Sequence, residues 1–196
     1  MFYSMKKIAL LLSLFCAINV AVCQRSLFRE YGFYGTASYT MLTNLNRADY
    51  SFMLNGVTLS GGFQIRPKTC VEIGVGFLAD NNKVFTQVPV TIALRTHYLP
   101  TRLTPTTEVF AGYAIPMKKE GLNSNGHKMH IDQGGVTAGV NVGARYAFSR
   151  HVAVNLYVGW HFFMTNEFTV TTTEKQPVIR EAWAAHCFRF GLGVMF

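Results

Sequence analysis

The stretch Arg189-Phe190-Gly191-Leu192-Gly193-Val194-Met195-Phe196 ends the sequence and decides the fold. Its even positions are all apolar, whereas Arg189, Gly191 and Gly193 at odd positions are charged or small. Side chains alternate between the two faces of a β-strand, so this stretch predicts a strand with one apolar face and one face of small or charged groups.

The same alternation recurs along the chain. Seven further stretches show it, at residues 31–41, 57–66, 71–77, 84–98, 109–115, 136–148 and 154–162. Short turns alternate with longer polar loops between them, and the last two loops are expected at 118–133 and 165–180. Eight strands joined in this way predict an all-β chain, an eight-stranded antiparallel up-and-down barrel. Pro89 lies inside the fourth stretch and predicts a bulge or a local break in the ladder.

The N-terminal residues predict a signal peptide at 1–23. Lys6 and Lys7 precede an apolar run from Ile8 to Cys23, which is shorter than a helical span. Met5 is an alternative start, and acylation of Cys23 is a rival interpretation. Residues 24–30 are expected to form a short periplasmic segment, and residues 31–196 the barrel. No later apolar run approaches the ~20 residues of a transmembrane helix.

Composition narrows the function classes. Without the signal peptide the chain keeps 16 basic and 10 acidic residues, and the basic ones are scattered, which argues against nucleic-acid binding. Such a surplus suits anionic lipid or lipopolysaccharide phosphate. Cys70 and Cys187 remain, in a compartment that permits disulfides. They are expected at different heights in the barrel, too far apart to bond, and so to be free thiols.

The glycine-rich polar face predicts which side faces the lumen. Glycine weakens a strand without benefit if it faces water, but in a narrow barrel it leaves room for large groups such as Tyr34, Arg66, Phe110 and Tyr157. The charged residues of that face then form a lumen charge network of Glu72, Arg95, Glu108, Arg145 and Arg189, whose charges must pair. The opposite face is expected to meet lipid. Its aromatic girdles are predicted at Tyr98, Tyr146, Phe148 and Phe196 at one end, and Tyr39, Trp160, Phe162 and Trp183 at the other.

The terminal residues carry a resemblance. Arg189, Gly191, Val194 and Phe196 resemble the C-terminal signal that the outer-membrane barrel assembly machinery recognises. Together with the eight alternating stretches, residues 31–196 resemble the small outer-membrane β-barrels that include OmpX and the transmembrane domain of OmpA. The resemblance implies a monomer with a side-chain-filled lumen in the outer membrane of a Gram-negative bacterium. Both termini and the short turns would be periplasmic.

The sequence favours a non-enzymatic barrel with a structural or surface-interaction role through its extracellular loops. Its expected partners are outer-membrane lipid, lipopolysaccharide, the assembly machinery and an unidentified envelope or host molecule. No catalytic, cofactor or metal site is predicted. One alternative is an accessory of an envelope machine such as protein secretion. Another is a lipid A modifying enzyme, but His186, on the lipid face, lacks a serine partner. An eight-stranded barrel is just filled by side chains, which argues against a pore.

Overall fold

The computed structural model describes residues 32–44, 53–80, 86–118, 120–122, 128–149, 151–171 and 179–196. The predicted signal peptide and the segment 24–30 lie outside these residues. The strands are β1 (Gly32–Asn44), β2 (Met53–Arg66), β3 (Thr69–Asp80), β4 (Thr86–His97), β5 (Leu103–Lys118), β6 (Glu120–Leu122), β7 (Lys128–Gln133), β8 (Gly135–Ala147), β9 (Ala153–Thr171) and β10 (Ile179–Met195). No helix in this part of the chain is long and apolar enough to cross a membrane.

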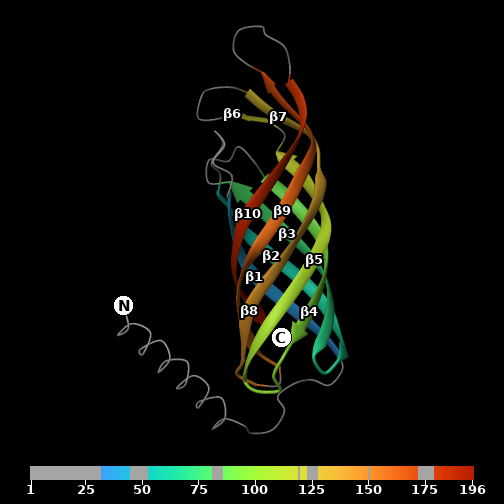
Figure 1. Ribbon diagram of the computed structural model, residues 1–196, viewed down its shortest axis with the longest axis vertical. Coiled ribbons are helices and arrows are strands. Elements are labelled where there is room, and N and C mark those ends of the chain that lie inside the picture. The colour runs from blue at the N-terminus through green and yellow to red at the C-terminus, as the bar shows by residue number, and fades with distance from the viewer. Residues whose placement is uncertain are drawn as a thin grey trace, which may run out of the picture.

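Eight of these strands close into a barrel, as the sequence predicts (Figure 1). Every pairing is antiparallel, and each of β1, β2, β3, β4, β5, β8, β9 and β10 pairs with the next in that order. The last strand returns to the first, with Thr36 opposite Met195 and Asn44 opposite Cys187. Beyond the last pair, the backbones of Gly35 and Phe196 exchange hydrogen bonds of 2.8 and 2.9 Å. The closed ladder leaves no open edge along the barrel wall.

The prediction of irregular loops at 118–133 and 165–180 is wrong in part. β6 and β7 pair with each other, and β7 pairs with the outer part of β9. β9 runs on to Thr171 and β10 begins at Ile179, so these strands rise above the barrel as an outer sheet (Figure 1). We use "outer sheet" for β6, β7, residues 165–171 of β9 and residues 179–183 of β10. We call this end of the barrel the loop end and the opposite end, with the short turns, the turn end.

Pro89 breaks the ladder locally without shifting its register. Val75 pairs with Val90 and Leu78 with Gln87, which is one continuous register, yet the two intervening positions are unpaired. A proline has no N–H to donate to a neighbouring strand. Its ring is accommodated by Gly76, where an added Cβ would lie 2.9 Å from the proline Cγ. Of the two predicted outcomes, the structure shows the local break.

The barrel is apolar outside and polar inside. Outward side chains such as Leu59, Ile73 and Val142 are 62%, 63% and 56% exposed, whereas the inward Glu72, Arg95 and Asn141 are buried. A soluble protein rarely exposes a continuous apolar surface of this extent. The strand alternation therefore places the apolar face outward, as the sequence predicts for a membrane barrel.

Candidate functional site

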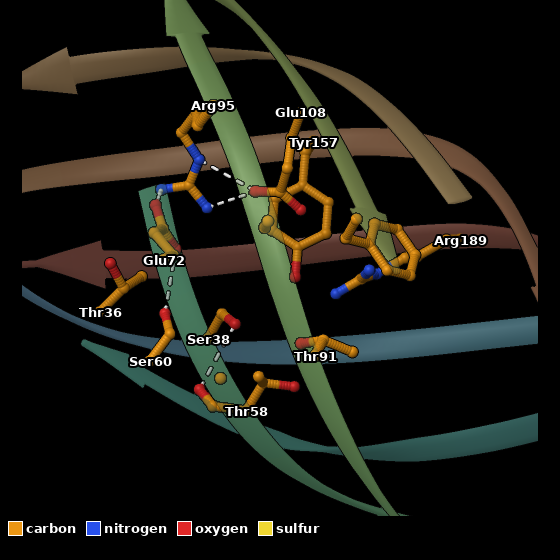
Figure 2. Close-up of a pocket in the computed structure, with 13 residues that line it drawn as sticks. Thr36, Ser38, Thr58, Ser60, Glu72, Thr91, Arg95, Glu108, Tyr157 and Arg189 are labelled. Carbon is orange, nitrogen blue, oxygen red and sulfur yellow. Dashed lines mark hydrogen bonds and ion pairs between the residues drawn. The ribbon is translucent and has the colours of Figure 1, made fainter. Parts of the chain in front are cut away.

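Arg95 joins two carboxylates inside the lumen (Figure 2). Its Nη1 lies 2.8 Å from Oε1 of Glu72 on β3, and its Nε donates a 2.9 Å hydrogen bond to Oε2 of Glu108 on β5. All three residues are buried. Paired charges with additional hydrogen bonds are the form in which ionised groups are tolerated in a low-dielectric interior.

Neutral neighbours donate further hydrogen bonds to the two carboxylates. Tyr34 donates its hydroxyl to Oε1 of Glu72 at 2.8 Å, and Ser60 donates to Oε2 at 3.0 Å. The side-chain amide of Asn141 donates to Oε1 of Glu108 at 2.8 Å. Six strands, β1 to β5 and β8, thus contribute to one connected network across the barrel interior.

The other two predicted network members, Arg145 and Arg189, also lie in the lumen. The guanidinium of Arg189 lies 4.5 Å from the ring centroid of Phe110 and 5.2 Å from that of Tyr157, which are cation–π contacts. Arg145 on β8 is buried nearer the turn end, opposite Asn155 of β9. The structure therefore brings Arg95 together with both carboxylates and places Arg189 against aromatic faces.

Glycines provide the space for the large lumen side chains. An added Cβ would lie 2.4 Å from the ring of Tyr34 at Gly62, 2.5 Å from the ring of Phe110 at Gly139, and 2.1 Å from the ring of Tyr157 at Gly191. The predicted relation between small and large inward residues holds for these three pairs. It does not hold for Arg66, which is exposed at the end of β2 beside the turn.

Gly191→Ala is expected to destabilise the barrel by about 1–3 kcal/mol, because the new methyl group overlaps the Tyr157 ring. That ring is held in place by the 2.9 Å contact between its hydroxyl and Thr40. Gly61→Ala is the matched control, since nothing lies within 4 Å of an added Cβ there. Urea unfolding in lipid vesicles measures both. Equal stability of the two variants would contradict the packing account.

The space left inside the network is small. A cavity of about 30 Å³ lies between the network and the hydroxyl-bearing wall of β1, β2 and β4, lined by Ser38, Thr58, Thr91 and their neighbours (Figure 2). This is room for water molecules but not for a solute path. The side chains of the network therefore occupy the lumen around this small cavity.

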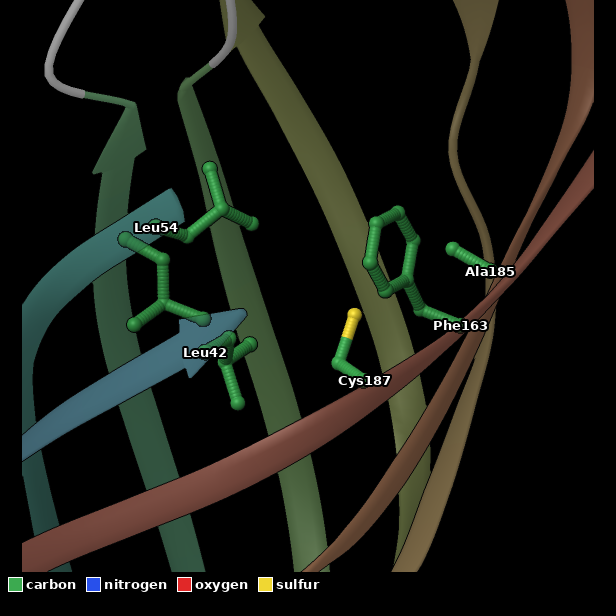
Figure 3. Close-up of a cluster of buried hydrophobic side chains, with 6 residues drawn as sticks. Leu42, Leu54, Phe163, Ala185 and Cys187 are labelled. Carbon is green, nitrogen blue, oxygen red and sulfur yellow. The ribbon is translucent and has the colours of Figure 1, made fainter. Parts of the chain in front are cut away.

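Toward the loop end of the lumen, buried apolar side chains form a cluster that we call the apolar plug (Figure 3). It consists of fully or almost fully buried side chains from five strands: Leu42, Leu54, Leu78, Phe163, Ala185 and Cys187. This cluster is not among the features predicted from the sequence. The signal was present as apolar doublets at the loop ends of four strands, Met41-Leu42, Met53-Leu54, Phe77-Leu78 and Phe162-Phe163. In each doublet the first member faces outward and the second inward.

The turn end is narrowed by a second cluster. Ala147, Ala153 and Met195 pack together, with Tyr34 against them. Cys70 is buried at the start of β3, whereas Cys187 lies in the plug, and both are free thiols, as predicted. No group of three His, Cys, Asp or Glu side chains in the described part of the chain is arranged to hold a metal.

The predicted girdle residues with described side chains lie on the outer surface. Tyr39, Tyr98, Tyr146, Phe148, Trp160 and Phe196 are exposed and Phe162 is half-buried. Phe33 and Phe63, which the prediction omitted, add an aromatic pair at the turn end with centroids 4.9 Å apart. Trp183 differs: its side chain lies outside the described part, and its backbone register is that of the inward Ala185 and Cys187.

The terminal signal residues divide between the two faces. Val194 and Phe196 are exposed on the outside, whereas Arg189 is buried and Gly191 lies against Tyr157. In the folded barrel the terminal pattern therefore contributes to both the outer surface and the packing of the lumen.

Two histidines occupy opposite sides of the β9–β10 pair. His161 is buried in the lumen, where its Nε2 lies 2.7 Å from the Thr137 hydroxyl, a pair that the sequence analysis missed. His186 faces outward and stacks against Trp160, with ring centroids 5.6 Å apart and planes at 22°. Neither histidine has a serine and carboxylate arrangement beside it among the contacts described.

No protein-family model and no curated protein matches this sequence. Solved structures do share its shape. Neisserial surface protein A of Neisseria has a TM-score of 0.61 at 11% identity, over 85% of this chain and 98% of that one. Outer membrane protein OprG from Pseudomonas aeruginosa has a TM-score of 0.58 at 14% sequence identity, over 88% of this chain and 99% of that one. Outer membrane protein AlkL, solved in lipid bilayers, has a TM-score of 0.51 at 15% sequence identity, over 89% of this chain and 93% of that one. The chain has the fold of the small eight-stranded outer-membrane β-barrels.

Proposed function

We propose that this protein is a non-enzymatic, non-conducting barrel of the outer membrane that presents its outer sheet as an interaction surface. The observation that carries the proposal is the filled lumen: the Arg95 network fills its middle and the apolar plug its loop end. A barrel without a passage offers its surfaces, not its interior, to other molecules. Both termini and the short turns would then lie in the periplasm and the outer sheet outside the cell.

The outer sheet supports an interaction role because its strands extend beyond the closed wall. β9 has 19 residues and β10 has 17, against 12 to 14 in β1 to β4. About 9–11 residues are enough for a strand to span a bilayer. The additional pairing of β7 with β9 makes an ordered platform outside the barrel.

Native purification from the outer membrane tests this proposal. A matched variant would replace residues 165–183 with a short turn and keep the barrel strands. We expect an envelope or host protein to accompany the intact chain and to be lost with the shortened one, while both remain heat-modifiable barrels. Equal recovery of every companion with both chains would contradict the surface role. A changed lipid A mass on overexpression would contradict the non-enzymatic role.

A further inference from the structure

We propose that His186 and Trp160 form an outward-facing site for the phosphate headgroup of an outer-leaflet lipid. This inference rests on the proposed location of the barrel in the outer membrane. The site is built on two paired strands. His186 of β10 lies opposite Phe162 of β9, and Trp160 lies two residues before Phe162 on β9. The three rings form one aromatic cluster.

His186 is exceptional in its surroundings. Among the outward strand positions whose side chains are described, no other residue is Asp, Glu, Lys, Arg or His. The remaining residues at these positions are apolar, aromatic, small or neutral polar. An ionisable side chain on a lipid-facing surface is costly unless a partner satisfies it. Its neighbours on β9 and β10, Trp160, Phe162, Ala184 and Phe188, carry no ionisable group. Among the described residues no ionisable group faces His186, and a lipid headgroup would supply such a partner.

The position of His186 along the barrel wall favours contact with the lipid headgroup over contact with the acyl chains. The next residue, Cys187, pairs with Asn44, the last residue of β1, so His186 lies at the rim where the closed wall ends. Below it on the same face, Phe188, Leu192 and Val194 are exposed and apolar. Aromatic residues concentrate at this level in membrane barrels because their rings suit the boundary between hydrocarbon and headgroups.

The chemistry of the cluster suits an anion. A protonated imidazole has two N–H donors and forms charge-assisted hydrogen bonds with a phosphate. The face of Trp160 stabilises a cation within about 6 Å of its centroid, and the His186 ring lies at 5.6 Å. The phosphate would thus accept hydrogen bonds from the His186 ring beside the Trp160 indole. The acyl chains of the same lipid would contact the outward apolar side chains of β10.

The test uses Trp160 as its reporter. The chain has two tryptophans, so Trp183→Phe leaves Trp160 alone. The barrel in zwitterionic detergent at pH 6 is titrated with diphosphorylated lipid A and with the same lipid after dephosphorylation. We expect a saturable fluorescence change with the phosphorylated lipid, and affinity weakened about tenfold by His186→Gln, as for loss of a charge-assisted hydrogen bond. His186→Arg should retain binding.

His151→Gln is the matched control, because that histidine is exposed in the turn at the opposite end of the barrel. It should leave the titration unchanged. Equal affinity for the dephosphorylated lipid, or no effect of His186→Gln, would overturn the headgroup site while leaving the barrel function intact. Failure of the unsubstituted chain to insert into lipid vesicles as a heat-modifiable barrel would instead overturn the proposed function, and this site with it.

Discussion

Arg95→Met is expected to lower the free energy of unfolding by about 3–5 kcal/mol. The substitution keeps a side chain of similar length but removes the charge that Glu72 and Glu108 share. Both carboxylates are buried, so each would remain as an uncompensated charge in a low-dielectric interior. Breaking a buried pair in this way costs more than replacing the whole pair, because the remaining ions keep their full desolvation penalty.

Urea unfolding in lipid vesicles, followed by tryptophan fluorescence, measures this loss. The triple variant Arg95→Met with Glu72→Gln and Glu108→Gln should recover much of the stability, since no unpaired charge remains. Arg102→Met is the matched control, because Arg102 is exposed beside a turn. If Arg95→Met unfolded at the same urea concentration as the unsubstituted chain, the lumen network would not stabilise the barrel.

Phe163→Ala is expected to cost a similar amount, about 3–5 kcal/mol, through loss of packing rather than charge. Phe163 is 0% exposed and packs in the plug with Leu42, Leu54 and Cys187 from the facing strands. A truncation there leaves a cavity that closed strands can collapse into only partly. The backbone around it is fixed by pairing with β8 and β10.

Phe148→Ala separates this packing effect from general loss of aromatic area. Phe148 is 61% exposed on the outer surface near the turn end. Its truncation should cost clearly less in the same unfolding experiment. Equal losses for the two variants would show that the plug contributes no more than any outward aromatic residue.

The alternation of the strands made the barrel predictable. A period of two along eight stretches defines which residues face the lumen, and strands such as β8 keep that period from Gly135 to Ala147. The glycines of the polar face also predicted that the lumen has room for Tyr34, Phe110 and Tyr157. In a narrow lumen a large side chain on one strand requires a small residue beside it on another. These features are local and repeat in the chain.

The missed features depend on long-range pairing. The outer sheet mixes polar residues such as Lys128, His130 and Asn166 with scattered apolar ones, and its strands are defined by the long-range pairing of β7 with β9. The plug consists of inward apolar side chains, three of them leucines, that interrupt the polar pattern at separate points of the chain. The girdle prediction for Trp183 stays a prediction, because its side chain lies outside the described residues. Arg66 was assigned to the lumen by alternation alone, yet it lies where β2 ends.

Single-channel recording in planar lipid bilayers tests the central claim, that the lumen is filled, most directly. The purified, refolded barrel should insert without producing stable conductance steps, because the side chains of the Arg95 network cross the lumen beside a cavity of about 30 Å³ and the plug lies at the loop end. Steady, ohmic steps from the unsubstituted protein would show an open passage and contradict the account.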